Sequence, residues 1–263
     1  MVEAAMKFDD AAAYERFMGR WSRAVAPVFL AWLGARQRSS WLDVGCGTGI
    51  LTETLLELCA PATVHAIDPA AAQLDAASHG SAAGRALFQV ADARRLPFAE
   101  RSFDVVASAL VINFIPDPLP AVMEMRRVAR AGGFVTGYVW DFAAEASPSG
   151  PLRRSMRRFG IDVPAIPGTG ASRLEALRAL FTAAGLEQIE TRTIDVCLAY
   201  ADFDDFWEAQ TPGYAPTTKI IAAMKNSERT RLMRAVRADL PTGPNGSIEY
   251  CARANAIKAR APR

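Results

Sequence analysis

The chain has 263 residues, a formal net charge of +2, and 51% hydrophobic and 22% charged residues. A chain of this size and composition can bury the core of a globular protein, and its charge indicates no polyanionic partner such as nucleic acid. No apolar run is long enough to cross a membrane, and the first residues lack the hydrophobic region of a signal peptide. We therefore expect a cytoplasmic protein without membrane contact.

The cysteine and histidine content predicts neither a disulfide framework nor a metal centre. Cys46, Cys59, Cys197 and Cys251 lie far apart and form no Cys-x-x-Cys pair. We expect all four to be reduced thiols, as is usual in the cytoplasm. With only two histidines, the sequence offers no multi-histidine metal site.

Residues 1–35 are expected to form a helical cap segment ahead of the first strand. Between residues 9 and 33 apolar side chains recur at helical spacing, which predicts an amphipathic helix, broken near Gly19 and Pro27. Such a helix would pack over the sheet edge or over a bound ligand. Trp21 belongs to the apolar stripe, and the pattern leaves open whether it packs in the core or contacts a ligand.

The stretch Trp41–Gly49 predicts a strand that ends in a ligand-binding loop. Its sequence, WLDVGCGTG, is an apolar run with an acid, followed by glycine at every second position, and a helical stretch continues from Ile50 to Cys59. Glycines let the backbone turn tightly and lie against a ligand, and the helix N-terminus adds unpaired N–H groups. Together these elements predict a nucleotide-binding corner of an α/β sheet.

The spacing of the glycines argues against a dinucleotide site. Gly45, Gly47 and Gly49 form Gly-x-Gly-x-Gly, whereas the dinucleotide fingerprint is Gly-x-Gly-x-x-Gly. Asp43 stands directly before the loop, where its carboxylate would repel a pyrophosphate and attract an ammonium group. The loop therefore favours a ligand that carries an amino group.

The next predicted strand, residues 63–68, also ends in an acid. Asp68 follows the glycine loop by roughly twenty residues, which is the spacing of an acid that binds a ribose diol at the end of the second strand. One carboxylate can accept from two neighbouring hydroxyls. Alternatively, Asp68 before Pro69 would cap the helix 70–78. The two roles are compatible.

Further motifs follow in a defined order as far as Asp141. They are the strands Phe88–Ala93 and Ser102–Leu110, the turn Arg130–Gly133 and the strand Phe134–Trp140. With the motif DVGCGTG, this series closely resembles the class I S-adenosylmethionine (SAM)-dependent methyltransferases, of the small-molecule type similar to methyltransferase domains 11 and 25. The Asn/Asp-Pro-Pro-Tyr/Phe motif of nucleic-acid enzymes that methylate amino groups is absent after the fourth strand, which favours a small-molecule acceptor.

The resemblance implies SAM as the cofactor. Asp92 and Ala93 match family positions that contact the adenine, although Asp92 taken alone would read as a surface turn acid. Ser108 and Ala109 match positions near the methionine part. In family members an aromatic or basic residue of the N-terminal helices often closes over the methionine end. The expected cofactor contacts are Tyr14 and Arg20 in that segment, then Asp43, Gly45, Cys46, Gly47, Gly49, Asp68, Pro69, Asp92, Ala93, Ser108 and Ala109.

The alternation of strands and helices predicts a Rossmann-like α/β fold of the class I methyltransferases. We expect a seven-stranded, mostly parallel sheet with an antiparallel last strand, helices on both faces and a helical cap. Residues 36–200 would form the SAM-binding core, 201–245 a helical insertion that serves as the cap, and 246–263 the last strand. Four arginines between residues 153 and 158 share one helical face, which favours a solvated surface over a site for an anionic acceptor or RNA.

The acceptor is expected beyond the carboxyl ends of the strands. Aromatic residues are dense in the segments that reach this rim, which suits a small apolar or aromatic acceptor, although any one of them could instead attach the cap to the sheet. The expected substrate contacts are Trp21, Phe114, Trp140, Phe206, Trp207 and Tyr214.

Only one acid is a candidate for a catalytic base. Asp141 follows the fifth strand at the rim, but a helix cap or loop acid is the favoured interpretation. Methyl transfer from a sulfonium needs little beyond in-line orientation, which supplies roughly 7–11 kcal/mol of barrier reduction. The sequence identifies no secure catalytic residue.

Three functions compete on the sequence alone. The favoured one is a SAM-dependent methyltransferase that transfers a methyl group to a small molecule by in-line displacement. The alternative is a non-catalytic SAM-binding or methyltransferase-like partner module. A NAD-dependent oxidoreductase is disfavoured by the glycine spacing, by Asp43 and by the lack of a Tyr-x-x-x-Lys pair. The acceptor, the atom methylated and the oligomeric state stay open.

Overall fold

The protein, seen in a computed structural model that describes residues 15–263, is built around a seven-stranded sheet. The strands are β1 (Ser40–Val44), β2 (Thr63–Asp68), β3 (Leu87–Val90), β4 (Phe103–Ala109), β5 (Ala129–Trp140), β6 (Glu187–Tyr200) and β7 (Ile248–Arg260). The helices are η1 (Glu15–Gly19), α2 (Arg20–Leu33), α3 (Ile50–Leu58), α4 (Ala71–Ser78), η2 (Ile112–Phe114), α5 (Leu119–Val128), α6 (Gly150–Arg158), η3 (Thr169–Ser172), α7 (Leu174–Ala183), α8 (Phe203–Gln210), α9 (Pro216–Ala222) and α10 (Asn226–Ala238).

The strand order is β3-β2-β1-β4-β5-β7-β6. β1 pairs in parallel with β2 and β4, and β5 continues in parallel beside β4. β7 runs antiparallel between β5 and β6. The predicted mostly parallel sheet with an antiparallel last strand is confirmed. The chain order reverses between β1 and β4, and sheets of this kind bind ligands in the crevice outside the carboxyl ends of the strands at such a point.

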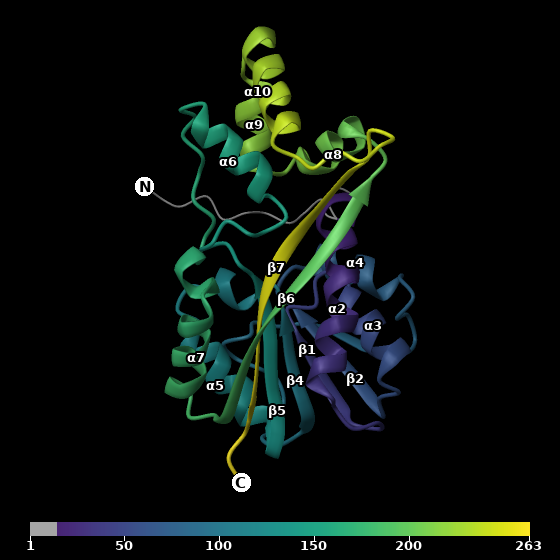
Figure 1. Cartoon of the computed structure of the whole chain (residues 1–263). Helices are drawn as coiled ribbons and strands as arrows, with labels where there is room; N and C mark the ends of the chain where they lie inside the picture. The colour runs from purple at the N-terminus through teal and green to yellow at the C-terminus, as the bar shows by residue number, and fades with distance from the viewer. Residues whose placement is uncertain (1–14) are drawn as a thin grey trace.

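Helices cover both faces of the sheet (Figure 1): α2, α3 and α4 lie on one face, and α5 and α7 lie on the other. Successive side chains of a strand point to opposite faces, so each strand contributes to two cores. Val105 of β4 belongs to the cluster with α2 and α3, whereas its neighbour Val106 belongs to the cluster with α5 and α7. This double burial explains why the parallel strands are apolar along most of their length.

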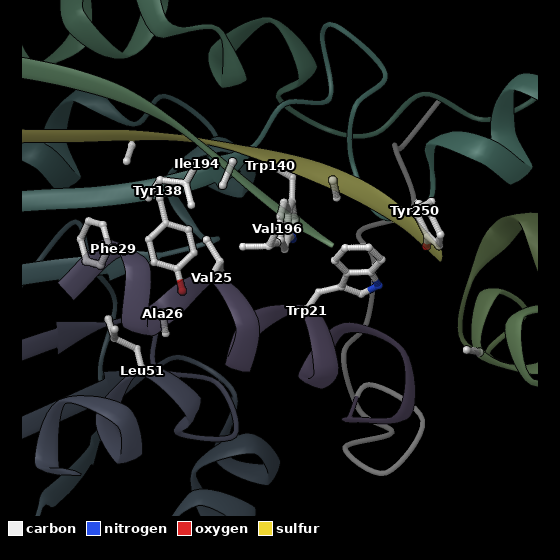
Figure 2. Packing of buried hydrophobic residues seen from close by; sticks show 14 of the residues in the cluster. Trp21, Val25, Ala26, Phe29, Leu51, Tyr138, Trp140, Ile194, Val196 and Tyr250 are labelled. Atoms are coloured by element: carbon white, nitrogen blue, oxygen red, sulfur yellow. The ribbon is translucent and has the colours of Figure 1, made fainter. Parts of the chain in front are cut away.

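Helix α2 packs along the sheet through one apolar face. Trp21, Val25 and Phe29 are four residues apart, so they share that face, and all three are fully buried. In Figure 2 they point toward the strands that carry Tyr138 and Trp140. The predicted break at Pro27 is wrong, because α2 continues through this proline; the helix is held by its packing against the sheet.

The segment after β6 forms α8, α9 and α10, which lie within the inserted residues 201–245. Helix α6, from the segment after β5, packs beside α10 at the same end of the molecule (Figure 1). Ser155 and Arg158 of α6 both donate hydrogen bonds to the carboxylate of Asp239, directly after α10. The helical cap therefore contains α6 as well as the insertion.

Two of the cysteines correct the expectation of four reduced thiols. Cys197 of β6 lies directly opposite Cys251 of β7, with 3.9 Å between their Cα atoms, and the two sulfur atoms are bonded. They are 54 residues apart, so only the register of the two antiparallel strands brings them together. Cys46 and Cys59 are free thiols.

Residues 15–263 contain neither a membrane-spanning helix nor a cluster of metal-ligating side chains. No helix in this part of the chain has the length and hydropathy needed to span a membrane. These residues also contain no group of three or more His, Cys, Asp or Glu side chains that could hold a metal ion.

Candidate functional site

A cavity of about 630 Å³ lies where the carboxyl ends of the central strands meet the cap. One end is lined by the glycine loop after β1 and by the residues that follow β2. The other end is lined by aromatic and aliphatic side chains from η1, the loops after β4 and β5, and the cap. This is the crevice that the strand order predicts.

The glycine loop is held in a conformation that side chains disfavour. Gly45, Gly47 and Gly49 have φ angles of +76°, +54° and +91°. A Cβ atom on Gly45 would lie 2.5 Å from Val111, whereas a Cβ on Gly47 would meet no protein atom within 4 Å. Gly45 is therefore required by packing, and the space beside Gly47 is open to a ligand.

Asp43 is a buried acid below this loop. Its side chain is fully buried, Thr52 Oγ1 donates to its Oδ2 at 2.7 Å, and its Oδ1 has no hydrogen-bond partner within residues 15–263. Burial raises the pKa of Asp43 to about 7; the bond from Thr52 partly offsets this effect, and the charge of Asp68 adds to it. An ammonium group at the cavity wall would satisfy Oδ1 and restore the charged carboxylate.

Asp68 braces the glycine loop and the turn that leads into α4. Its Oδ1 accepts the N–H of Ala70 at 2.8 Å, ahead of α4, and its Oδ2 accepts the N–H of Gly47 at 3.0 Å. The same residue lines the cavity, and burial raises the pKa of its carboxyl. Each oxygen keeps a lone pair for a hydroxyl of a ligand, so the brace for the glycine loop does not block a ribose contact.

Of the other expected cofactor residues, Cys46, Pro69 and Ala109 also line the cavity. Gly49 lies behind it, as the residue at the start of α3. Ser108 is buried in β4 and does not reach the cavity wall.

The predicted adenine residues lie outside the cavity lining. The carboxylate of Asp92 is exposed and accepts hydrogen bonds from the backbone N–H of Arg94 at 2.8 Å and from its guanidinium, the shortest from Nη2 at 2.7 Å. This is the surface-turn arrangement that the sequence left as the alternative. Ala93 beside it is also absent from the lining.

The expected closure of the methionine end by Arg20 does not match its position. Arg20 Nη2 donates to the carbonyl of Ala199 at 2.8 Å, and Nη1 lies 3.6 Å from Asp205. Its guanidinium therefore ties α2 to β6 and α8. Tyr14, the other candidate, lies outside the described residues. At the glycine loop itself, the hydroxyl of Thr48 donates a hydrogen bond to the carboxylate of Glu15 at 2.6 Å.

The aromatic end contains three of the six expected acceptor contacts. Phe114, Trp140 and Tyr214 line the cavity together with Phe142, whose ring lies 6.1 Å from that of Phe114. The segment at the start of the described chain adds Phe17, Met18 and Ser22, which the sequence analysis did not single out.

The other three expected contacts pack in the core or against it. Trp21 is fully buried, with its ring 6.2 Å from that of Trp140. Phe206 is fully buried against Tyr200, and Trp207 packs on Phe203. None of the three lines the cavity, because their helices turn these side chains toward β6 and β7.

Asp141 is a loop acid. Its Oδ1 accepts the N–H of Ala144 at 3.0 Å, and it does not line the cavity. Among the described residues of the lining, the carboxylates are those of Asp43 and Asp68, both at the glycine-loop end. Asp141 thus holds a turn, as the favoured interpretation of the sequence expects.

The residues present fit SAM at the glycine-loop end. The unpartnered oxygen of Asp43 suits the α-amino group, the two oxygens of Asp68 suit the ribose hydroxyls, and the open space beside Gly47 suits close approach of the ligand to the backbone. A pyrophosphate would face two carboxylates here.

The strand order is that of the Rossmann-like methyltransferase fold, and the glycine loop and the acids after β1 and β2 agree with a cofactor site of the class I, SAM-dependent type. Residues 42–136 match the family model described as a methyltransferase domain. The match over this part of the chain agrees with the class that its motifs resemble.

Similar proteins act on different molecules according to their names. A malonyl-[acyl-carrier protein] O-methyltransferase of Marinomonas sp. is 34% identical over 134 residues, covering 51% of this chain and 50% of that one. A demethylmenaquinone methyltransferase of Staphylococcus aureus is 36% identical over 105 residues, covering 39% and 44%. The chain thus matches half or less of the length of these two relatives.

A solved structure shares the fold along most of the chain. Phosphoethanolamine N-methyltransferase 2 of Haemonchus contortus, in complex with phosphomonomethylethanolamine and S-adenosylhomocysteine, has a TM-score of 0.59 and 18% identity. The match covers 97% of this chain and 58% of that one. At this identity the likeness supports the fold alone.

Proposed function

We propose that the protein is a SAM-dependent methyltransferase that acts on a small, largely apolar acceptor. The observation that carries the proposal is the continuity of one cavity from the glycine loop and Asp68 to the aromatic end with Phe114 and Trp140. Such a chamber brings two ligands end to end, and a donor and an acceptor must meet in this way for direct transfer.

At the glycine-loop end, the chain's own residues bind and orient the cofactor. Asp43 Oδ1 accepts from the ammonium group, Asp68 accepts from the ribose hydroxyls, and the loop backbone lies against the ligand at Gly47. When bound, SAM supplies a methyl group on a sulfonium; an electron pair of the acceptor forms the new bond as the sulfur–methyl bond breaks, and S-adenosylhomocysteine remains.

At the aromatic end, the lining favours an acceptor that provides its own nucleophile. The apolar walls exclude water and hold the acceptor in line, and the carboxylates of the described lining are at the opposite end. A neutral amine or an already ionised oxygen or carbon meets this requirement, and any proton released passes to water at the cavity mouth.

The test is formation of S-adenosylhomocysteine from SAM with a panel of small aromatic and apolar amines, phenols and acids. We expect turnover with members of the panel and its loss in Gly47→Trp, a substitution that fills the open space beside the loop. Binding of S-adenosylhomocysteine without turnover of any acceptor would instead support the non-catalytic module. The folded fraction of each variant is checked by circular dichroism.

A further inference from the structure

The cavity holds one cation among its described lining residues, Arg153. It lies in the first turn of α6, next to Ser149, which also lines the cavity. The other charged lining residues, Asp43 and Asp68, belong to the opposite end. Arg153 therefore gives the acceptor end a positive charge, and the N-terminal end of α6 adds to it in the same region.

Arg153 differs from the other arginines of its helix. Arg157 forms an ion pair with Glu145, and Arg158 forms one with Asp239. Arg154 is exposed and donates to the carbonyl of Glu145 at 2.7 Å. The expectation of a solvated arginine face thus holds for three of the four and is wrong for Arg153, which is half-buried and faces the cavity.

Arg153 forms a hydrogen bond to a neutral carbonyl group, which does not neutralise its positive charge. One nitrogen, Nη2, donates to the carbonyl of Pro164, and no carboxylate of residues 15–263 lies within ion-pair distance. Burial away from water lowers the pKa of this guanidinium. Partial burial of a cation without a counter-ion is unfavourable, and an anion that binds beside it offsets this cost.

Gln210 is a second polar side chain at the acceptor end of the cavity. It is 2% exposed and lines the cavity. Its Nε2 donates to the carbonyl of Pro148 at 3.1 Å and to the hydroxyl of Tyr250 at 2.6 Å. Because a carbonyl can only accept, the amide orientation is fixed, and Oε1 is left buried without a partner within the described chain. Pro148 precedes Ser149, so Gln210 lies beside the start of α6.

We propose that the acceptor is a small aromatic or apolar carboxylic acid whose carboxylate binds Arg153 and which donates a hydrogen bond to Oε1 of Gln210. This inference rests on the proposed function and names its substrate class. A single guanidinium among apolar walls balances one negative charge, which favours a carboxylate over a doubly charged phosphate. A carboxylate held by an arginine is a weakened nucleophile, so the methyl group goes to another atom of the same molecule.

The experiment measures binding of matched ligand pairs rather than turnover. 4-Hydroxybenzoate, 4-hydroxyphenylacetate, 4-hydroxycinnamate and indole-3-acetate, each with a donor besides its carboxylate, are compared with their primary amides by ligand-observed NMR titration, with and without S-adenosylhomocysteine. We expect acids of the panel to bind the parent protein about tenfold or more tightly than their amides, as a charge-assisted hydrogen bond predicts. Arg153→Met should abolish this preference, and Arg153→Lys should retain part of it.

Two controls separate charge recognition from a structural role. Arg154→Met, on the same helix but exposed, should leave the acid preference unchanged. Arg153→Met should also leave the affinity for S-adenosylhomocysteine unchanged, since the cofactor's own carboxylate is not its ligand. A fall of acid and amide binding by the same factor would show that Arg153 only anchors Pro164, and would overturn the proposal.

Three further results would also overturn it: equal binding of acids and amides to the parent, no binding of either series, or loss of S-adenosylhomocysteine affinity in Arg153→Met. Failure of the parent to bind S-adenosylhomocysteine would instead contradict the proposed function, whereas the acid preference measured without that ligand still tests Arg153.

Discussion

Thr52 donates its hydroxyl to Oδ2 of Asp43 at 2.7 Å and leaves Oδ1 of the same carboxylate without a partner. One side of the acid is thus fixed by α3 and the other is available to a ligand of the cavity. The buried carboxyl is costly to ionise alone, and this cost makes cofactor binding sensitive to pH.

The first prediction follows from the pKa of Asp43, which burial raises to about 7. Below that pH the free protein carries a neutral carboxyl, and a ligand's ammonium group binds after the proton has left. Affinity for S-adenosylhomocysteine should therefore rise between pH 6 and 7.5 by roughly an order of magnitude. Calorimetric titration across this range measures it. In Asp43→Asn the affinity for S-adenosylhomocysteine should be lower and independent of pH over this range. A parent protein whose affinity does not change with pH would refute the role of Asp43.

The second prediction distinguishes two glycines of the loop. Gly45→Ala should lower the melting temperature more than Gly47→Ala, because its Cβ would lie 2.5 Å from Val111 while that of Gly47 meets no protein atom within 4 Å. In both variants alanine must also adopt a positive φ, which reduces stability by about 1–2 kcal/mol. Adding Val111→Ala to Gly45→Ala should recover part of the lost melting temperature, because it removes the side-chain atoms that the new Cβ would meet. Gly47→Ala should mainly reduce cofactor affinity. Equal melting temperatures for the two single variants would contradict this account.

The third prediction concerns Arg20. Its bonds to Ala199 and Asp205 join α2 to the cap, so Arg20→Met should reduce stability by about 1 kcal/mol or less and leave the S-adenosylhomocysteine affinity unchanged. Denaturant unfolding and calorimetry measure the two quantities. The matched variant Asp205→Asn should behave in the same way. A large loss of cofactor affinity in Arg20→Met alone would restore the role expected from the sequence.

The fourth prediction concerns the pair Cys197–Cys251, which closes a loop that contains α8, α9 and α10. With a sequence separation of 54 between the cysteines, the bond should stabilise the oxidised protein by up to about 4 kcal/mol relative to Cys197→Ser/Cys251→Ser. Thermal unfolding with and without reductant measures the effect. In the control Cys59→Ser, reductant should change the melting temperature by the same amount as in the parent. Two free thiols at these positions under non-reducing mass spectrometry would refute the bond.

The sequence was most informative where local motifs decide the structure. Gly45, Gly47 and Asp68 are recognisable because turn geometry and strand order require these residue types near the switch point. The parallel sheet and its antiparallel last strand could likewise be predicted from the alternation of elements.

Residues placed by long-range packing could not be predicted. Arg153 and Gln210 reach the cavity only because α6 and α8 fold over it, and helical spacing does not reveal which face of a cap helix is turned inward. For Trp21 and Phe206 the aromatic residue type suggested ligand contacts. Packing against β6 and β7 instead buries both side chains away from the cavity. The disulfide also depends on strand register.

The most direct test of the central claim is calorimetric titration of the parent and Asp68→Ala with S-adenosylhomocysteine, with NADH as the control ligand. We predict that S-adenosylhomocysteine binds the parent and NADH does not, and that Asp68→Ala, shown to be folded by circular dichroism, binds at least about tenfold more weakly. Binding of NADH, no binding of S-adenosylhomocysteine, or equal affinity in Asp68→Ala would contradict the assignment of the glycine-loop end as a SAM site.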